Sequence, residues 1–182
     1  MDKITLAHGS GGRLMHELID SLFIKELDNE IVRKKKDAAT FKFGNKELAF
    51  TTDSYVVNPI FFPGGDIGSL AVHGTVNDLS VCGARPLFIS VAMIIEEGFD
   101  RRSLERITRS IKIAAKRSGV KVVTGDFKVV EKSSCDKIFI NTPAEMTNIR
   151  CHIGLARNSQ GSGDFPMNSV SKLSSIMPAI FT

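Results

Sequence analysis

Three stretches of the chain repeat apolar residues every three or four positions, which is the spacing of one helical face turned toward a core. The first covers residues 13–27 and follows directly on a glycine-rich loop. The second covers about residues 67–82, between an aspartate suited to cap its start and a glycine suited to end it. The third lies between Asp100 and Gly119. The pattern therefore predicts three helices.

Strand-like segments separate these helices. Residues 40–54 alternate between apolar and polar on both sides of Gly44 and Asn45, which predicts a hairpin that turns at this pair. Successive strand residues point to opposite faces, so Asp53, at the end of the second strand, shares a face with Ala49.

Three further apolar segments complete the predicted sheet. Residues 85–97 are almost continuously apolar, as in a strand buried on both faces. Residues 120–130 and 135–142 are typical of two more strands, joined by a polar turn. We therefore expect a mixed α/β (α+β) domain over residues 1–142. Residues 143–182 show no sustained period and are rich in Ser, Asn, Gly and Pro, so we expect an irregular, disordered tail.

Composition narrows the class of protein. The 182 residues are 42% hydrophobic, which is enough for a folded core, and the net charge is only +4. The basic run at residues 33–36 is short, and the chain has one Tyr and no Trp, so nucleic acid is not an expected partner. The sequence shows no leader and no bilayer-length apolar run, so we expect a cytoplasmic protein without membrane contact.

Acidic residues and glycines indicate where the chemistry lies. Asp37, Asp53, Asp78 and Asp126 fall at positions where side chains are commonly exposed, and Mg²⁺ prefers carboxylate oxygens combined with substrate phosphates. The glycine-rich loop at residues 8–12 can turn backbone N–H groups toward an anion at the start of a helix. The same features also serve as ordinary caps and turns. From the residues alone, the hypothesis is an α/β domain that binds a nucleotide or phosphate.

Longer strings in the sequence resemble one family. AHGSGG, LAFTTDSYVVNPIFFPGGDIG, LAVHGTVNDLSVCGARP, VTGDFKVV and DKIFINT occur in the order found in the HypE family of hydrogenase maturation factors. They cover about residues 7–142. The string FFPGGDIG separates HypE from the related aminoimidazole ribonucleotide synthetase, selenophosphate synthetase and thiamine monophosphate kinase. The chain is thus similar to the N-terminal domain of HypE proteins.

The resemblance implies a fold, a reaction and partners. HypE-like N-terminal domains form homodimers, in which the two sheets join into a shared barrel and ATP binds near the interface. With ATP and Mg²⁺, these carbamoyl dehydratases convert a carboxamide on a C-terminal cysteine into a thiocyanate. That group becomes the cyanide ligand of iron in [NiFe]-hydrogenase. The implied partners are a carbamoyltransferase and an iron-carrying maturation complex.

The resemblance also implies roles for individual residues. Asp37, Asp53 and Asp78 match the acidic residues that hold the metal and the phosphates. Asn77, Asp126 and Lys128 fall in the two other nucleotide motifs, and the charge of Lys128 makes it the candidate catalytic residue. A glycine-rich segment that closes on the phosphates is matched here by Gly9, Ser10, Gly11 and Gly12.

The chain departs from the family pattern in two places. Phe127 stands where the family usually has Thr, which would impair nucleotide binding if the ring faces the nucleotide and be tolerated if it faces the core. The resemblance ends near Thr142, where HypE chains continue into a second domain and a cysteine-bearing peptide, so we suspect a truncation or frameshift.

These two departures affect whether the chain can complete the dehydration reaction. None of the three cysteines, Cys82, Cys135 and Cys151, has a sequence setting like that peptide. We expect an ATP-binding and dimerisation half that does not complete the dehydration alone. The alternative is a non-catalytic dimerisation or partner-docking module of the same fold.

Overall fold

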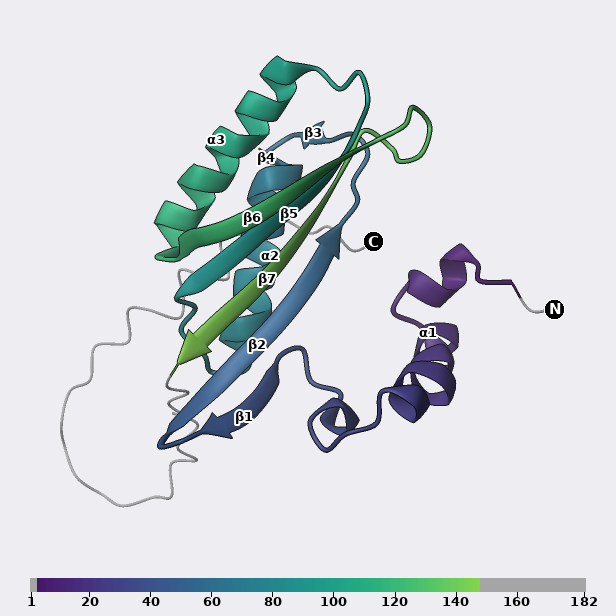
Figure 1. Cartoon of the computed structure of the whole chain (residues 1–182), viewed down its shortest axis with the longest axis vertical. Coiled ribbons are helices and arrows are strands. Elements are labelled where there is room, and N and C mark those ends of the chain that lie inside the picture. The colour runs from purple at the N-terminus through teal and green to yellow at the C-terminus, as the bar shows by residue number, and fades with distance from the viewer. Residues whose placement is uncertain (1–2, 148–182) are drawn as a thin grey trace. The chain divides into compact units, whose positions relative to one another are not determined.

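The computed structural model describes residues 3–147, which contain a mixed five-stranded sheet (Figure 1). The strand order is β1-β2-β7-β5-β6, and the β5–β6 pair is parallel whereas the other neighbours are antiparallel. This confirms the expected mixed sheet and the hairpin turn, with Phe43 opposite Lys46. The strands are β1 (Ala39–Phe43), β2 (Lys46–Tyr55), β5 (Phe88–Glu96), β6 (Lys121–Val130) and β7 (Ile138–Thr147).

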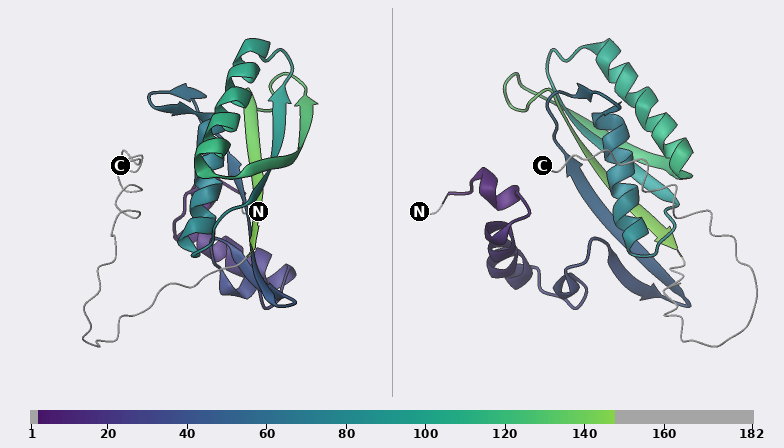
Figure 2. Two further views of the ribbon diagram at one scale, coloured as in Figure 1. Left: turned by 90° about the vertical axis from the view of Figure 1, so that its left-hand side faces the viewer. Right: turned by 180° about the vertical axis from the view of Figure 1, so that it is seen from behind.

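Two helices, α2 (Ile67–Val81) and α3 (Arg101–Ser118), cover one face of the sheet (Figure 2). The predictions for both helices are confirmed. The Asp66 carboxylate accepts a hydrogen bond from Ser69 N at 2.9 Å to cap α2, and Gly119, at a φ of 70°, ends α3. The two helices approach closely at Gly68, where an added Cβ would lie 2.7 Å from the Ile107 carbonyl oxygen.

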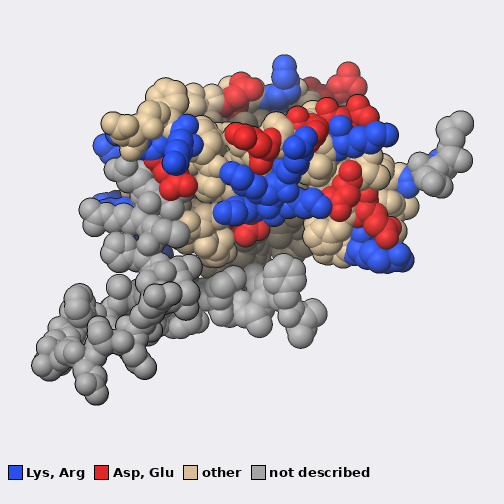
Figure 3. Space-filling view, turned by 90° about the horizontal axis from the view of Figure 1, so that it is seen from below, with Lys and Arg blue, Asp and Glu red and all other residues tan. Residues whose placement is uncertain are grey.

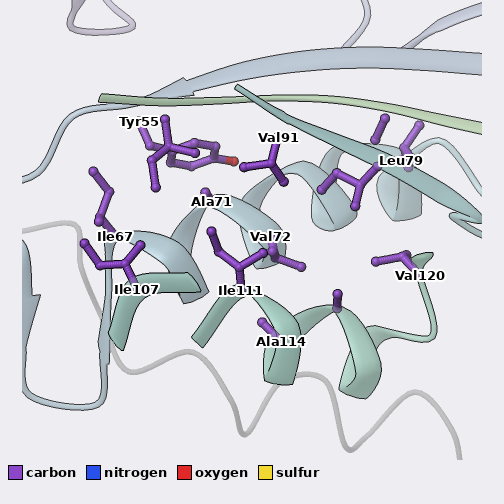
Figure 4. Close-up of a cluster of buried hydrophobic side chains, with 14 of the residues drawn as sticks. Tyr55, Ile67, Ala71, Val72, Leu79, Val91, Ile107, Ile111, Ala114 and Val120 are labelled. Carbon is purple, nitrogen blue, oxygen red and sulfur yellow. The ribbon is translucent and has the colours of Figure 1, made fainter. Parts of the chain in front are cut away.

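The core lies between the sheet and these helices (Figure 4). On the three middle strands, alternate residues face the helices: Ala49 on β2, Ile89 on β5 and Ile140 on β7 are all buried. The helices contribute Leu79 and Ile107, both fully buried. The hydrophobic effect on this one face therefore accounts for the stacking of α2 and α3 on the sheet.

The N-terminal segment is helical but less regular than expected. The predicted helix over residues 13–27 begins as α1 (Arg13–Leu18) and continues as a π-helical segment (Ile19–Ile24). Two 3₁₀ turns flank it at Leu6–Gly9 and Val32–Lys34. In the basic run that follows, Arg33 pairs with Asp28 and Lys35 with Asp20. These pairs and the exposure of residues 33–36 agree with a solvated role for the run. Charges of both signs are interspersed on the face of the molecule shown in Figure 3.

A short hairpin, β3 (Phe61–Phe62) and β4 (Gly65–Asp66), was not predicted from the sequence. Gly64 takes a φ of 90° at its turn, a conformation that favours glycine. The Arg106 guanidinium of α3 lies 3.9 Å from the centre of the Phe61 ring, so a cation–π contact joins the hairpin to α3.

Three details of the predicted sheet were wrong. Asp53 does not end its strand, because β2 continues to Tyr55. The last strand does not end at Thr142, because β7 continues to Thr147. Pro143 is tolerated in this central strand because it falls where the β5–β7 register is interrupted, between Asn141 and Ala144. Strand β5 is buried on one face only, since alternate side chains from Phe88 to Ile94 point away from the helices.

Two further expectations concern membrane contact and the C-terminal tail. None of the helices in residues 3–147 is both long and apolar enough to cross a bilayer. The expected tail lies outside the described residues from position 148 onward, and so does Cys151.

Candidate functional site

Three of the predicted aspartates gather where β1, β2 and α2 meet. Asp53 is half-buried on the helix-covered face of β2, between the buried Thr51 and Tyr55. Asp78 is half-buried on α2. Asp37 is exposed just before β1, and its backbone carbonyl accepts a 2.8 Å hydrogen bond from the Thr51 hydroxyl. The sheet and the helix therefore bring together residues that are 41 positions apart in the sequence (78 − 37).

The carboxylates of Asp37 and Asp53 lie close enough to Asp78 to affect it. Burial raises the pKa of Asp78 above its ordinary value, and the negative charges of Asp53 and Asp37 raise that pKa further. Repulsion of this kind on Asp78 is relieved when a cation binds. The aspartates thus form an electrostatically coupled acidic cluster, which we define as Asp37, Asp53 and Asp78.

The donor chemistry of the acidic cluster suits Mg²⁺, which takes oxygen ligands. Within residues 3–147, no three acidic, His or Cys side chains converge closely enough to hold an ion by themselves. Mg²⁺ commonly binds through one or two carboxylates while substrate phosphates complete its coordination. The cluster therefore fits a cation that arrives with a nucleotide.

Tyr55 was missed by the sequence analysis, although it lies in the quoted string two residues after Asp53. Its ring is buried between the sheet and α2 (Figure 4). Burial raises the pKa of the Tyr55 hydroxyl, and the charges of Asp53 and Asp78 raise it further. The signal available in the sequence was alternation, because residues 51, 53 and 55 share one face of the strand.

Asp126 and Lys128 lie away from the acidic cluster. Both are exposed on β6, the edge strand, and two strands (β7 and β5) separate β6 from β2. Asp126 is paired with Ala92 and Lys128 with Ile94, so both point to the face that the helices leave open. Within one chain, the structure does not bring these two residues to Asp53.

Phe127 lies on the edge strand β6 and not in the core. The ring is 68% exposed, so it is not part of the core. It points opposite to its neighbours Asp126 and Lys128 and is paired with Met93. The replacement of the family's usual Thr therefore adds apolar surface to the edge strand.

The remaining predicted residues are exposed. Asn77 precedes Asp78 on α2 and faces solvent. In the glycine-rich segment, Ser10 Oγ donates to the Ala7 carbonyl at 2.9 Å, and Gly11 takes a φ of 77°. A Cβ added at Gly9 or Gly11 would meet no atom within 4 Å. The segment thus leaves open space around its glycines.

The part of the chain that carries this geometry matches a known protein family. Residues 35–144 match the family described as AIR synthase related protein, N-terminal domain. The chain belongs to this family. The matched region contains the sheet up to residue 144 of β7, together with α2, α3, the acidic cluster, Asp126 and Lys128, whereas the glycine-rich segment precedes it.

Several similar curated proteins carry the name carbamoyl dehydratase HypE. The chain is 49% identical over 140 residues to the carbamoyl dehydratase HypE of Rhizobium leguminosarum bv. viciae, covering 77% of this chain and 40% of that relative. It is 43% identical over 169 residues to the protein of the same name from Escherichia coli (strain K12), covering 90% of this chain and 50% of the relative. The second alignment is longer than residues 7–142, so similarity continues past Thr142. The chain therefore spans half or less of these relatives.

Solved structures of HypE proteins are also similar to this chain. A crystal structure of a HypE–HypF complex shares 55% identity with a TM-score of 0.67, covering 71% of this chain and 42% of that chain. A crystal structure of HypE in complex with ATP shares 53% identity with a TM-score of 0.55, and the match covers 79% of this chain and 43% of that chain. These likenesses confirm the family resemblance recognised in the sequence.

Proposed function

We propose that the acidic cluster binds Mg²⁺ together with the phosphates of ATP. The electrostatic coupling of Asp37, Asp53 and Asp78 carries this proposal, because the cluster supplies oxygen donors and a negative potential that a cation would relieve. The similarity to a HypE crystallised with ATP supports the choice of nucleotide. The exposed glycine-rich segment at residues 9–12 is free to close over the phosphates with its backbone N–H groups.

The reaction that we propose for the assembled protein is ATP-dependent dehydration of a carboxamide on a cysteine, in the maturation of [NiFe]-hydrogenase. The names of the similar curated proteins support this choice. ATP supplies the phosphoryl group that makes the amide oxygen a good leaving group. In this chain, Asp53 and Asp78 would orient the metal, Asp37 would add charge, and Asn77 would contact the nucleotide from α2.

A homodimer is the arrangement that gives Asp126 and Lys128 a place near the nucleotide. These residues lie on the open face beside exposed apolar side chains such as Ile94. Joining two open faces as a barrel would bury that surface and bring the edge strand of one copy toward the other. Lys128 would then neutralise charge on the transferred phosphate. HypF, which occurs in a complex with a similar HypE, indicates the kind of maturation partner that we expect.

The exposed apolar face also favours a second candidate function, a dimerisation or docking module without turnover. Calorimetric titration with Mg-ATP distinguishes the two functions. The wild-type chain should bind, whereas Asp53→Asn and Asp78→Asn should each weaken binding by about tenfold or more, a loss of about 1.4 kcal/mol.

Glu105→Gln is the matched control for this titration, because Glu105 is an exposed acid on α3 that pairs with Arg101. It should bind like the wild type. Absence of binding by the wild type, or unchanged binding by both aspartate variants, would refute the ATP site and leave the docking module.

A further inference from the structure

A chain of three hydroxyl groups crosses the core directly below the acidic cluster. The Tyr55 hydroxyl lies 3.2 Å from Thr75 Oγ1, which hydrogen-bonds to Thr142 Oγ1, and Thr142 donates to the Ala71 carbonyl at 3.3 Å. All three hydroxyl residues are buried. This series of hydroxyl groups therefore joins β2, α2 and β7 through polar contacts inside an otherwise apolar core.

Either oxygen can be the donor in the Tyr55–Thr75 contact and in the Thr75–Thr142 contact. At the other end of these contacts, the Asp53 carboxylate accepts a 2.8 Å bond from Ser54 N and also lies within reach of the Tyr55 hydroxyl. The Tyr55 hydroxyl therefore lies between the helix α2 and the carboxylate of Asp53.

Gly74 allows this contact with α2. A Cβ added there would lie 2.9 Å from Tyr55 Cζ and 3.0 Å from Cε1, and it would be closer still to the hydroxyl oxygen. Gly74 is not among the glycines with positive φ, so the helix backbone itself would accept an alanine. The close approach of the tyrosine is therefore what requires a glycine at this position.

The contact lies at a defined place relative to the two carboxylates. Asp53 precedes Tyr55 by two residues on the same face of β2. Asp78 follows Gly74 by four residues, one helical turn further along α2. The distance from strand to helix at the tyrosine thus determines the distance between the carboxylates.

We propose that Tyr55 and Gly74 are positioning residues, which set the separation of Asp53 and Asp78 and thereby the fit of the cation between them. The inference rests on the proposed Mg-ATP site. A purely structural role would predict only that changes here alter the free energy of unfolding. A positioning role predicts a change in the metal-dependent part of nucleotide affinity in chains that remain folded.

The test compares the full chain with Gly74→Ala, Tyr55→Phe and the double variant. Crystal structures give the separation of the Asp53 and Asp78 carboxylates, and calorimetry gives ATP affinity with Mg²⁺ and with EDTA. Gly74→Ala should increase the separation and weaken Mg-ATP binding by about tenfold, while ATP binding in EDTA changes less. The double variant should recover part of both effects, because it removes the nearest clashing atom but keeps the ring carbons that lie 2.9 and 3.0 Å from the added Cβ.

Tyr55→Phe alone keeps the inference testable if Gly74→Ala does not fold, since it removes the oxygen without adding volume. It should lower Mg-ATP affinity by several-fold and shift the carboxylate separation. An unchanged separation in the folded variants overturns the positioning role, whether or not ATP binds. A shifted separation in a chain whose wild type does not bind Mg-ATP would instead overturn the proposed function and leave the geometric role in place.

Discussion

The two faces of the sheet are built differently. On the face toward α2 and α3, residues such as Ala49 and Ile140 are buried by the chain's own helices. On the opposite face, large apolar side chains remain in contact with solvent: Phe50, Phe88 and Ile94 are 42–44% exposed. The candidate site is divided in the same way, with Asp53 on the covered face and Lys128 on the open one.

This difference shows what one chain can complete by itself. The covered face has a packed core, and Asp53 and Asp78 of the acidic cluster are half-buried beside it. The open face presents exposed apolar side chains on β2 and β5, and β6 forms an edge of the sheet, a combination that is typical of an interaction surface. We therefore expect changes on the covered face to affect folding and changes on the open face to affect association.

The largest expected effect comes from the covered face. Leu79 is fully buried on α2 beneath the sheet, so Leu79→Ala should lower the free energy of unfolding by about 3 kcal/mol through lost burial and a residual cavity. Urea denaturation monitored by circular dichroism measures this change.

Ile113→Ala is the control, because Ile113 is 46% exposed on α3. Its cost should stay below about 1 kcal/mol. Equal losses in the two variants would mean that the covered face is not the principal core.

The open face should show the reverse behaviour. Ile94→Arg places a charge among exposed apolar side chains on β5 and should weaken self-association by about 2 kcal/mol or more, while the isolated chain unfolds almost as before. Sedimentation at micromolar concentration should show a dimer for the wild type and a monomer for this variant. If the dimer completes the ATP site, Mg-ATP affinity should fall as well.

Ile113→Arg is matched to Ile94→Arg in chemistry and in exposure, at 46% against 44%, but lies on the outer face of α3. It should leave the dimer intact. A wild-type chain that sediments only as a monomer would contradict the proposed barrel.

The sequence predicted most of the covered face. Helices α2 and α3 follow from an N-cap aspartate, a terminating glycine and a helical apolar period, all of which are local signals. The prediction for β5 was less accurate, because a continuous apolar run does not distinguish burial within one chain from burial against a second copy. The short β3–β4 hairpin depends on Gly64 and on a contact with Arg106 of α3. Neither feature can be recognised from the period of apolar residues.

For the candidate site, the sequence indicated some of the residues that lie together and missed others. The family resemblance named Asp37, Asp53 and Asp78, and the fold brings them together. Neither the motifs nor the spacing indicated that Asp126 and Lys128 would lie on the opposite face, because that depends on strand order and register. Tyr55 was missed because its role depends on a contact with Gly74, which lies on another element.

The smallest expected effect concerns the pH dependence of stability at the acidic cluster. The folded-state pKa of Asp78 is raised above the ordinary value of 3.8, so protonated Asp78 favours the folded state. Its contribution to stability is fully present below the unfolded-state pKa and is lost as pH rises through the folded-state pKa. At pH 7 without metal, the ionised carboxylate therefore destabilises the fold, and Asp78→Asn should raise the free energy of unfolding by about 0.5 kcal/mol.

Urea titrations in EDTA from pH 3 to pH 7 measure this gain, which should disappear toward the acidic end and shrink in high salt, since Asp78 is only half-buried. The Glu105→Gln variant should show no comparable gain. A variant that is both more stable and defective in Mg-ATP binding would indicate that the chain keeps an unfavourable charge at this position because the cation requires it. A less stable Asp78→Asn would instead mean that the carboxylate is a structural partner of its neighbours, and the cluster would lose its strongest support as a cation site.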